Sequence, residues 1–139
     1  VSGHTTNGVT PKAMYTAEIT NATKTYGPSN GTSKIGLMYV SDYMYAASPT
    51  YWTYKGYDTA TTDYRAATTS NWMYMGLSEW TITPISSSSS SVFRLYYNGY
   101  LNISNANIGY GGRPVLYLKA SVAYAGGSGT KDLPITLVV

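Results

Sequence analysis

The chain has 139 residues with nine basic and six acidic side chains, so its formal charge is +3 and charged residues make up only 11%. This length is sufficient for one domain with its own core. There is neither an apolar run of the roughly 20 residues that span a bilayer nor a coiled-coil heptad stretch. The basic residues are scattered, which argues against a nucleic-acid-binding surface. Cysteine is absent, which excludes disulfides and thiol chemistry.

The aromatic and hydroxyl residues favour β structure. Tyr occurs 16 times and Phe once, and Thr, Ser and Asn are also abundant. Tyr and Thr are enriched in strands. We therefore predict an α+β, mostly β fold with one or two short helices, in a single globular domain. The polar residues 1–12 are predicted to form a loose leader.

The chain after this leader contains short apolar runs. Residues 14–20 are compatible with a short helix or a strand, because helix formers and β-branched residues are mixed there. Residues 34–40 are predicted to form a buried strand. Ser41 and Asp42 follow it and are suitable N-cap residues for a short helix over 43–47.

The middle of the chain has weaker periodicity. Residues 50–71 are predicted to be an ordered surface loop that is fixed by its Trp and Tyr side chains. Strand character resumes at 72–76, and another strand is predicted over 79–84, where Pro84 ends it. The run of serines at 86–91 is predicted to be a flexible loop.

The strongest local signal is a hairpin. Asn98 and Gly99 form the pair that is most favoured in tight hairpin turns. They separate strands that are predicted over 92–96 and 101–104. A polar loop is expected to follow at 105–112.

The C-terminal part is predicted to contain two more strands. Residues 113–119 are apolar, and Pro114 lies near their start, where a missing N–H is tolerated. A Gly-rich turn at 126–130 then leads into a final strand over 133–139.

Residues able to perform catalysis are sparse. The single histidine, His4, lies in the predicted leader and is interpreted as a solvated side chain. The acidic residues are far apart in the sequence and match no metal-binding loop, so neither a metal nor a cofactor is predicted. A hydrolase would need two carboxylates that come together only in the folded chain. This is the third hypothesis for the function, after the two that are given below. Glu79 and Arg113 stand in apolar contexts and are expected to form a buried ion pair or to anchor a turn.

One segment has the composition of a binding surface. Between residues 86 and 113, Ser, Tyr and Asn supply 15 of 28 positions, which is the mixture found in antibody combining loops. Tyr offers a large amphipathic contact area with few rotamers to restrict, while Ser and Asn adapt their hydrogen bonds. The alternative is a set of ordinary polar loops on a Tyr-rich domain.

Several segments together resemble bacterial C-type-lectin-like domains. They are residues 72–84, 92–95, 98–101 and 113–118. The chain also resembles Tyr-rich surface or pilin-like proteins of gut Firmicutes, which end in a segment similar to Gly127–Pro134. The resemblance covers residues 33–139 and implies a C-type-lectin-like fold there, with a small mixed sheet, short helices and long loops. Residues 1–32 would then be the polar leader and a first element.

The variable proteins of diversity-generating retroelements use this fold to display a hypervariable binding face. Their similarity implies that Tyr, Ser and Asn positions between 86 and 111 form such a face, supported by framework-like residues such as Phe93 and Arg113. The implied ligand-binding residues are Arg94, Tyr96, Tyr97, Tyr100, Asn102, Ser104, Asn105, Asn107 and Tyr110. The Glu-Pro-Asn and Trp-Asn-Asp motifs of calcium-dependent lectins are absent, so calcium-mediated sugar binding is not expected. The related sulfatase-activating enzymes depend on Cys, which this chain lacks.

The sequence therefore predicts a non-enzymatic, adhesin-like or receptor-like module that is extracellular or displayed on a bacterial cell surface. Its expected partner is a protein or glycan ligand, with Tyr97, Tyr100 and Tyr110 as anchors and Arg113 as a support of the loop. The alternative is the globular head of a pilin or pseudopilin that contacts other pilus subunits. An anchor or pilin-like helix is expected to lie outside this sequence. Binding to nucleic acid and insertion into a membrane are not expected.

Overall fold

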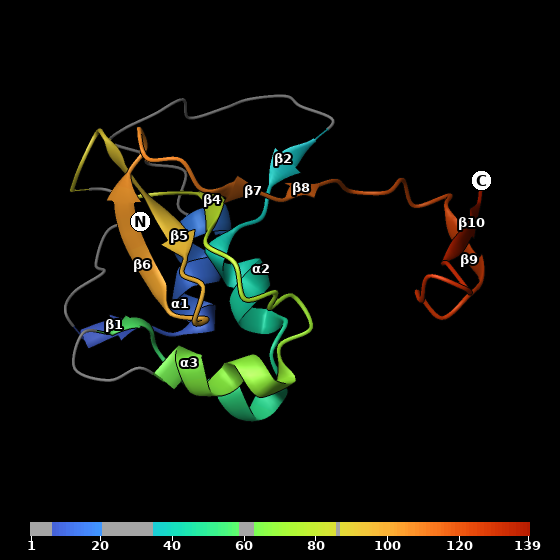
Figure 1. Ribbon diagram of the computed structural model, residues 1–139, viewed down its shortest axis with the longest axis horizontal. Coiled ribbons are helices and arrows are strands. Elements are labelled where there is room, and N and C mark those ends of the chain that lie inside the picture. The colour runs from blue at the N-terminus through green and yellow to red at the C-terminus, as the bar shows by residue number, and fades with distance from the viewer. Residues whose placement is uncertain (1–6, 21–34, 59–62, 86) are drawn as a thin grey trace.

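The computed structural model describes residues 7–20, 35–58, 63–85 and 87–139 (Figure 1). The fold is α+β, with more residues in strands than in helices. Its centre is a four-stranded sheet in the order β6-β5-β4-β7. The strands of this sheet are β4 (Glu79–Pro84), β5 (Ser91–Leu95), β6 (Leu101–Asn105) and β7 (Gly111–Gly112). Because β7 is parallel to β4 and the other pairs are antiparallel, the sheet is mixed.

The hairpin predicted around the Asn-Gly pair is confirmed. Strands β5 and β6 pair in register, with Leu95 opposite Leu101. The turn is closed by hydrogen bonds between Tyr96 and Tyr100 and from the Gly99 N–H to the Tyr96 carbonyl. Gly99 has a φ of +81°, which side-chain-bearing residues rarely adopt.

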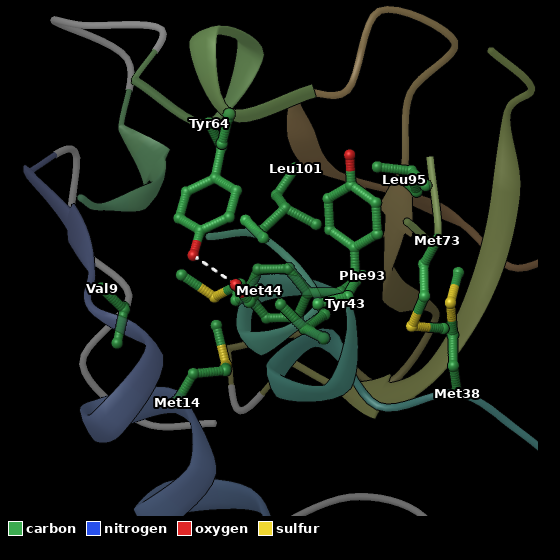
Figure 2. Close-up of a cluster of buried hydrophobic side chains, with 14 of the residues drawn as sticks. Val9, Met14, Met38, Tyr43, Met44, Tyr64, Met73, Phe93, Leu95 and Leu101 are labelled. Atoms are coloured by element: carbon green, nitrogen blue, oxygen red, sulfur yellow. Dashed lines mark hydrogen bonds between the residues drawn. The ribbon is translucent and has the colours of Figure 1, made fainter. Parts of the chain in front are cut away.

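The core forms where the inner face of this sheet meets three short helices (Figure 2). These helices are α1 (Pro11–Tyr15), α2 (Val40–Tyr45) and α3 (Asp63–Ala66). Tyr43, Tyr64 and Phe93 are fully buried there, and each large buried side chain contributes about 1.5–3 kcal/mol. The Tyr64 hydroxyl donates to the Met44 carbonyl at 2.9 Å (Figure 2), so a tyrosine fills a core position without losing its hydrogen bond.

Residues 7–12, which were predicted within a loose leader, belong to the folded body. Strand β1 (Asn7–Val9) pairs with β3 (Gly56–Asp58). Helix α1 begins at Pro11, and its N-cap Thr10 accepts a hydrogen bond from the Ala13 N–H. The chain continues in a π-helical turn over Thr16–Thr20. Of the two alternatives for residues 14–20, the structure therefore contains the helix.

Helix α2 begins earlier than the sequence predicted. Of the strand expected over 34–40, the described residues 35–40 form only β2 (Gly36–Leu37), which pairs with β8 (Pro114–Val115). The N-cap is Tyr39, and Asp42 lies inside the helix, where its carboxylate accepts from the Tyr39 N–H at 2.9 Å. The earlier start has a tertiary cause, because the buried Glu18 carboxylate accepts the N–H groups of Val40 and Ser41.

The middle of the chain also differs from the prediction. The expected loop at 50–71 contains 3₁₀ turns at Pro49–Tyr51 and Ala67–Ser70 together with β3 and α3. The strand expected over 72–76 is a series of turns and bends. Its cause is Asn71, whose amide group donates to the Tyr43 carbonyl at 2.7 Å and accepts from the Met73 N–H at 2.9 Å. The Met73 N–H, which a strand would have paired with a neighbouring strand, is thus satisfied by the Asn71 side chain.

The chain after β8 leaves the body of the protein (Figure 1). The strand predicted over 113–119 is limited to the two residues of β8. The predicted final strand is β10 (Thr136–Val138), which pairs with β9 (Ala123–Gly126) in an antiparallel hairpin. We call residues 116–139 the C-terminal arm, and none of them is buried. Among the described residues, no helix is long and apolar enough to cross a membrane.

Candidate functional site

A row of side chains crosses the outer face of the four-stranded sheet. The register places Trp80 of β4 opposite Arg94 of β5, and Arg94 opposite Asn102 of β6. Residues directly opposite each other on neighbouring strands project from the same face. The adjacent residues of these strands also lie opposite one another and are buried on the inner face; they are Glu79, Leu95 and Leu101. Strand alternation adds Ser104 to the outer face.

Arg94 is the centre of this row and is only 8% exposed. The carbon of its guanidinium group lies 4.3 Å from the ring centroid of Tyr96 and 4.6 Å from that of Tyr110. Each such cation–π contact contributes about 0.5–2 kcal/mol. The Tyr110 ring also makes an edge-on contact with Trp80, at a centroid distance of 5.0 Å. Three aromatic rings and one cation therefore form a single cluster.

The guanidinium group of Arg94 is incompletely hydrogen-bonded. Its Nε and Nη1 atoms are buried and have no hydrogen-bond partner in the part of the chain that the structure describes. Leaving buried charged donors unpaired is costly, because they lose water without gaining an acceptor. We define the aromatic-arginine cluster as Trp80, Arg94, Tyr96 and Tyr110.

The hairpin turn continues this cluster at one end. The rings of Tyr96 and Tyr97 are 4.5 Å apart between centroids. Tyr97 is 55% exposed, and its carbonyl accepts the Tyr74 hydroxyl at 2.9 Å. Tyr100 is half-buried in the same turn. Both predicted anchors of this turn therefore lie at the end of the outer face.

Asn105 and Asn107 belong to a different location. Asn105 is the last residue of β6 and Asn107 follows it in the next loop, and both line a hollow of about 290 Å³ together with Ser90 and Ala106. Asn105 also accepts a hydrogen bond from the Ser91 hydroxyl at 3.0 Å. Alternation along β6 sends Asn105 to the face opposite Asn102 and Ser104. Of the predicted residues, the structure brings five together on the outer face: Arg94, Tyr96, Asn102, Ser104 and Tyr110.

Trp80 was not among the residues predicted to form the site. Its position was assigned to a strand, but the side chain was not assigned to a face. Trp80 and Ile82 are two residues apart and both are at least partly exposed. That alternation with the buried Glu79, Thr81 and Thr83 is the signal that predicts a solvent-facing tryptophan.

The predicted buried ion pair is confirmed and fixes the edge of the site. Arg113 donates from Nε to Glu79 Oε1 at 3.1 Å and from Nη2 to Glu79 Oε2. Its Nη1 donates to the Met73 carbonyl at 2.8 Å. Since Glu79 pairs through its backbone with Gly111 of β7, the ion pair holds the segment next to Tyr110 against β4. The predicted supporting role of Arg113 agrees with this geometry.

The described acidic side chains Glu18, Asp42 and Glu79 make hydrogen bonds that hold the fold together. Glu18 accepts from the N–H groups of Val40 and Ser41 at 3.1 and 3.2 Å and from the Thr83 hydroxyl. Burial raises the pKa of the Glu18 carboxyl above its usual value. In the described part of the chain, no group of three or more His, Asp or Glu residues could hold a metal ion. His4 and the side chains of Asp58 and Asp63 lie outside that part.

A second hollow lies beside the root of the C-terminal arm. It measures about 580 Å³, and its mostly apolar lining includes Tyr45, Trp72, Met73, Leu116 and Tyr117. Trp72 is 80% exposed. The Asp42 carboxylate at this hollow raises the pKa of the Tyr117 hydroxyl.

Comparisons of the chain with family models, with curated proteins and with solved structures found no match. Inferences about function therefore depend on the geometry of this chain.

Proposed function

We propose that this protein is a non-catalytic ligand-binding module with a C-type-lectin-like fold, displayed outside the cell or on a bacterial surface. The aromatic-arginine cluster is the observation that carries the proposal. Binding hot spots are enriched in Trp, Tyr and Arg, and these three residue types meet here on one sheet face. The flanking Asn102 and Ser104 supply polar groups that fix the orientation of a ligand, which is a protein or a glycan.

The rigidity of the underlying sheet supports this proposal. Binding residues on paired strands lose little conformational entropy when a ligand is bound. The ion pair between Glu79 and Arg113 holds β7 beside β4, and the hydrogen-bonded turn at Gly99 holds β5 beside β6. The proposal includes diversification of the outward positions by a retroelement, because such diversification requires a fixed framework that carries variable side chains.

The proposal is tested with wild-type protein and the double variant Tyr96→Ser, Tyr110→Ser, applied to immobilised glycans and to intact bacterial and host cells. The variant is expected to lose at least tenfold in retained protein. The matched control is Tyr124→Ser, which removes an exposed tyrosine from the C-terminal arm and is expected to bind as the wild type does. Equal binding by all three proteins, or retention of none of them by any glycan or cell, would refute the proposal.

The C-terminal arm favours a second candidate function, a structural subunit such as a pilin or pseudopilin head. A two-stranded hairpin alone is marginally stable in water, and the arm that contains this hairpin carries exposed apolar side chains. They are Leu116, Leu118, Tyr124, Leu133, Ile135, Leu137 and Val138. Contact with a neighbouring subunit would cover them.

Sedimentation of the full chain tests this second function. Self-association that disappears in the double variant Leu133→Asp, Leu137→Asp is expected for a structural subunit. The control is Ser121→Asp, which places a charge at an exposed polar position of the arm. A monomer at every accessible concentration would argue against it.

A further inference from the structure

We propose that Arg94 binds the carboxylate of an acidic saccharide, for which the aromatic-arginine cluster is the binding site. This inference rests on the proposed function and adds the chemical class of the ligand. The observation behind it is a buried guanidinium group that has aromatic contacts but no anionic partner among the described residues.

The first step concerns the hydrogen bonds of Arg94. A guanidinium group has five N–H donors, all in its plane. The Tyr96 and Tyr110 rings contact the group as a cation, but a ring face does not replace an in-plane acceptor. Both Nε and Nη1 lack such an acceptor. A carboxylate accepts two parallel hydrogen bonds from one edge of a guanidinium group, and each edge that includes Nε or Nη1 is completed by Nη2.

The second step concerns the charge. Within the described residues, the ion pair that forms is the one between Arg113 and Glu79. That pair uses the Glu79 carboxylate on the inner side of β4, so it does not neutralise Arg94. The whole chain carries only six acidic residues and a charge of +3. An anionic ligand therefore supplies the negative charge that none of the described residues provides at Arg94.

The third step concerns the groups beside the guanidinium. Trp80, Tyr96 and Tyr110 offer aromatic surface, which suits the C–H faces of a sugar ring. The Asn102 Oδ1 atom accepts the Ile103 N–H at 2.8 Å, which leaves the NH₂ group of this side chain as the donor to a ligand. Together with the Ser104 hydroxyl, it matches the hydroxyl groups of a saccharide.

The fourth step concerns access. Because Arg94 is 8% exposed, a ligand reaches its nitrogen atoms only when one of the covering rings moves. Tyr110 is the ring expected to move, because it lies in the loop between β6 and β7 and not on a paired strand. Binding is thus expected to alter the contact between Trp80 and Tyr110.

The direct test observes the arginine Nε–H signals by nitrogen-15 NMR. The chain has three arginines, Arg65, Arg94 and Arg113, and the Arg94→Met variant identifies the Arg94 signal by its loss. Glucuronate is the probe, with glucose as its uncharged counterpart and acetate as the carboxylate without a sugar. We expect glucuronate to shift the Arg94 signal saturably, and at least tenfold lower apparent affinity for both glucose and acetate.

The variants separate a binding role from a structural role. Arg94→Met should abolish glucuronate binding, observed through the backbone signals of residues 80 and 110, and Arg94→Lys should weaken it at least tenfold. Arg65→Met is the matched control, because it removes an exposed arginine from α3, and it should bind as the wild type does. The melting temperature of Arg94→Met should equal or exceed that of the wild type, since an unpaired buried charge has been removed.

Several results would overturn the inference. Equal binding of acetate and glucuronate, or of an Asp-containing peptide in place of glucuronate, would exclude recognition of an acidic saccharide. A lower melting temperature of Arg94→Met with unchanged glucuronate shifts would make Arg94 structural. If wild-type protein and Arg94→Met bind the same neutral glycan through Tyr96 and Tyr110, this inference fails while the proposed function stands.

Discussion

The ion pair between Glu79 and Arg113 at the edge of the candidate site should lose more stability when Arg113 is removed than when Glu79 is neutralised, because the two side chains are unequally buried. The side chain of Glu79 is 5% exposed, whereas that of Arg113 is 20% exposed. Replacing Arg113 by Met leaves a buried carboxylate without a cation and removes the bond to the Met73 carbonyl. Breaking a buried pair in this way costs about 3–5 kcal/mol.

Replacing the other partner of the pair should cost less stability. In Glu79→Gln, Arg113 keeps the Met73 carbonyl as an acceptor, and its more exposed guanidinium group reaches water. The amide oxygen of the glutamine still accepts one hydrogen bond. The expected loss is about 1–2 kcal/mol, so the two variants should differ by at least about 1 kcal/mol.

Urea unfolding followed by circular dichroism measures these losses. Arg65→Met is the control because it deletes an arginine from an exposed position, and its effect should stay within about 0.5 kcal/mol. Equal losses for Arg113→Met and Glu79→Gln would refute the assignment of unequal burial. A loss below about 1 kcal/mol for Arg113→Met would show that the pair is solvated.

Three further predictions concern other parts of the chain. The raised pKa of Glu18 means that the folded state binds a proton more readily than the unfolded state, so the carboxyl stabilises the fold below its ordinary value of 4.5 and that stabilisation is lost as pH rises through the folded pKa. The urea unfolding free energy of the wild type minus that of Glu18→Gln should consequently decrease from acidic to neutral pH. A difference that stays constant would contradict the raised pKa of Glu18. Gly99→Ala should lose about 2–4 kcal/mol in the same assay, since its φ is positive and a Cβ would lie 2.0 Å from the Thr68 methyl carbon, whereas Gly109→Ala meets no atoms and should be neutral. In sibling copies of the gene, substitutions should concentrate at outward positions such as Arg94 and spare the buried side of the same strands, and an invariant outer face would exclude diversification.

Local sequence signals were sufficient for part of the fold. The Asn98-Gly99 pair and its flanking alternation specify the β5–β6 hairpin, because turn geometry and period-two patterning are properties of neighbouring residues. The isolated charges of Glu79 and Arg113 likewise indicated an ion pair, since buried charges require partners. The binding-loop composition of residues 86–113 indicated the part of the chain in which five candidate residues share a face, four of them on this hairpin.

Other features depended on contacts between distant segments. The start of α2 at Val40 is set by Glu18, and the turn after residue 71 is set by the bonds of Asn71 to Tyr43 and Met73. Such contacts override local propensity, so the predicted strand boundaries there were wrong. The sequence also gave no signal that the C-terminal strands would leave the body of the protein.

The sequence by itself determined the α+β character, the β5–β6 hairpin and the residue types available for binding. Tertiary structure decided which of these residues act together. Parallel pairing of β7 with β4 places Gly112 opposite Trp80, and this brings Tyr110 over Arg94. Asn105 is separated from the cluster because alternation turns it to the other face. Periodicity assigns a side chain to one side of a strand, but only the pairing of strands determines which side chains from different segments meet.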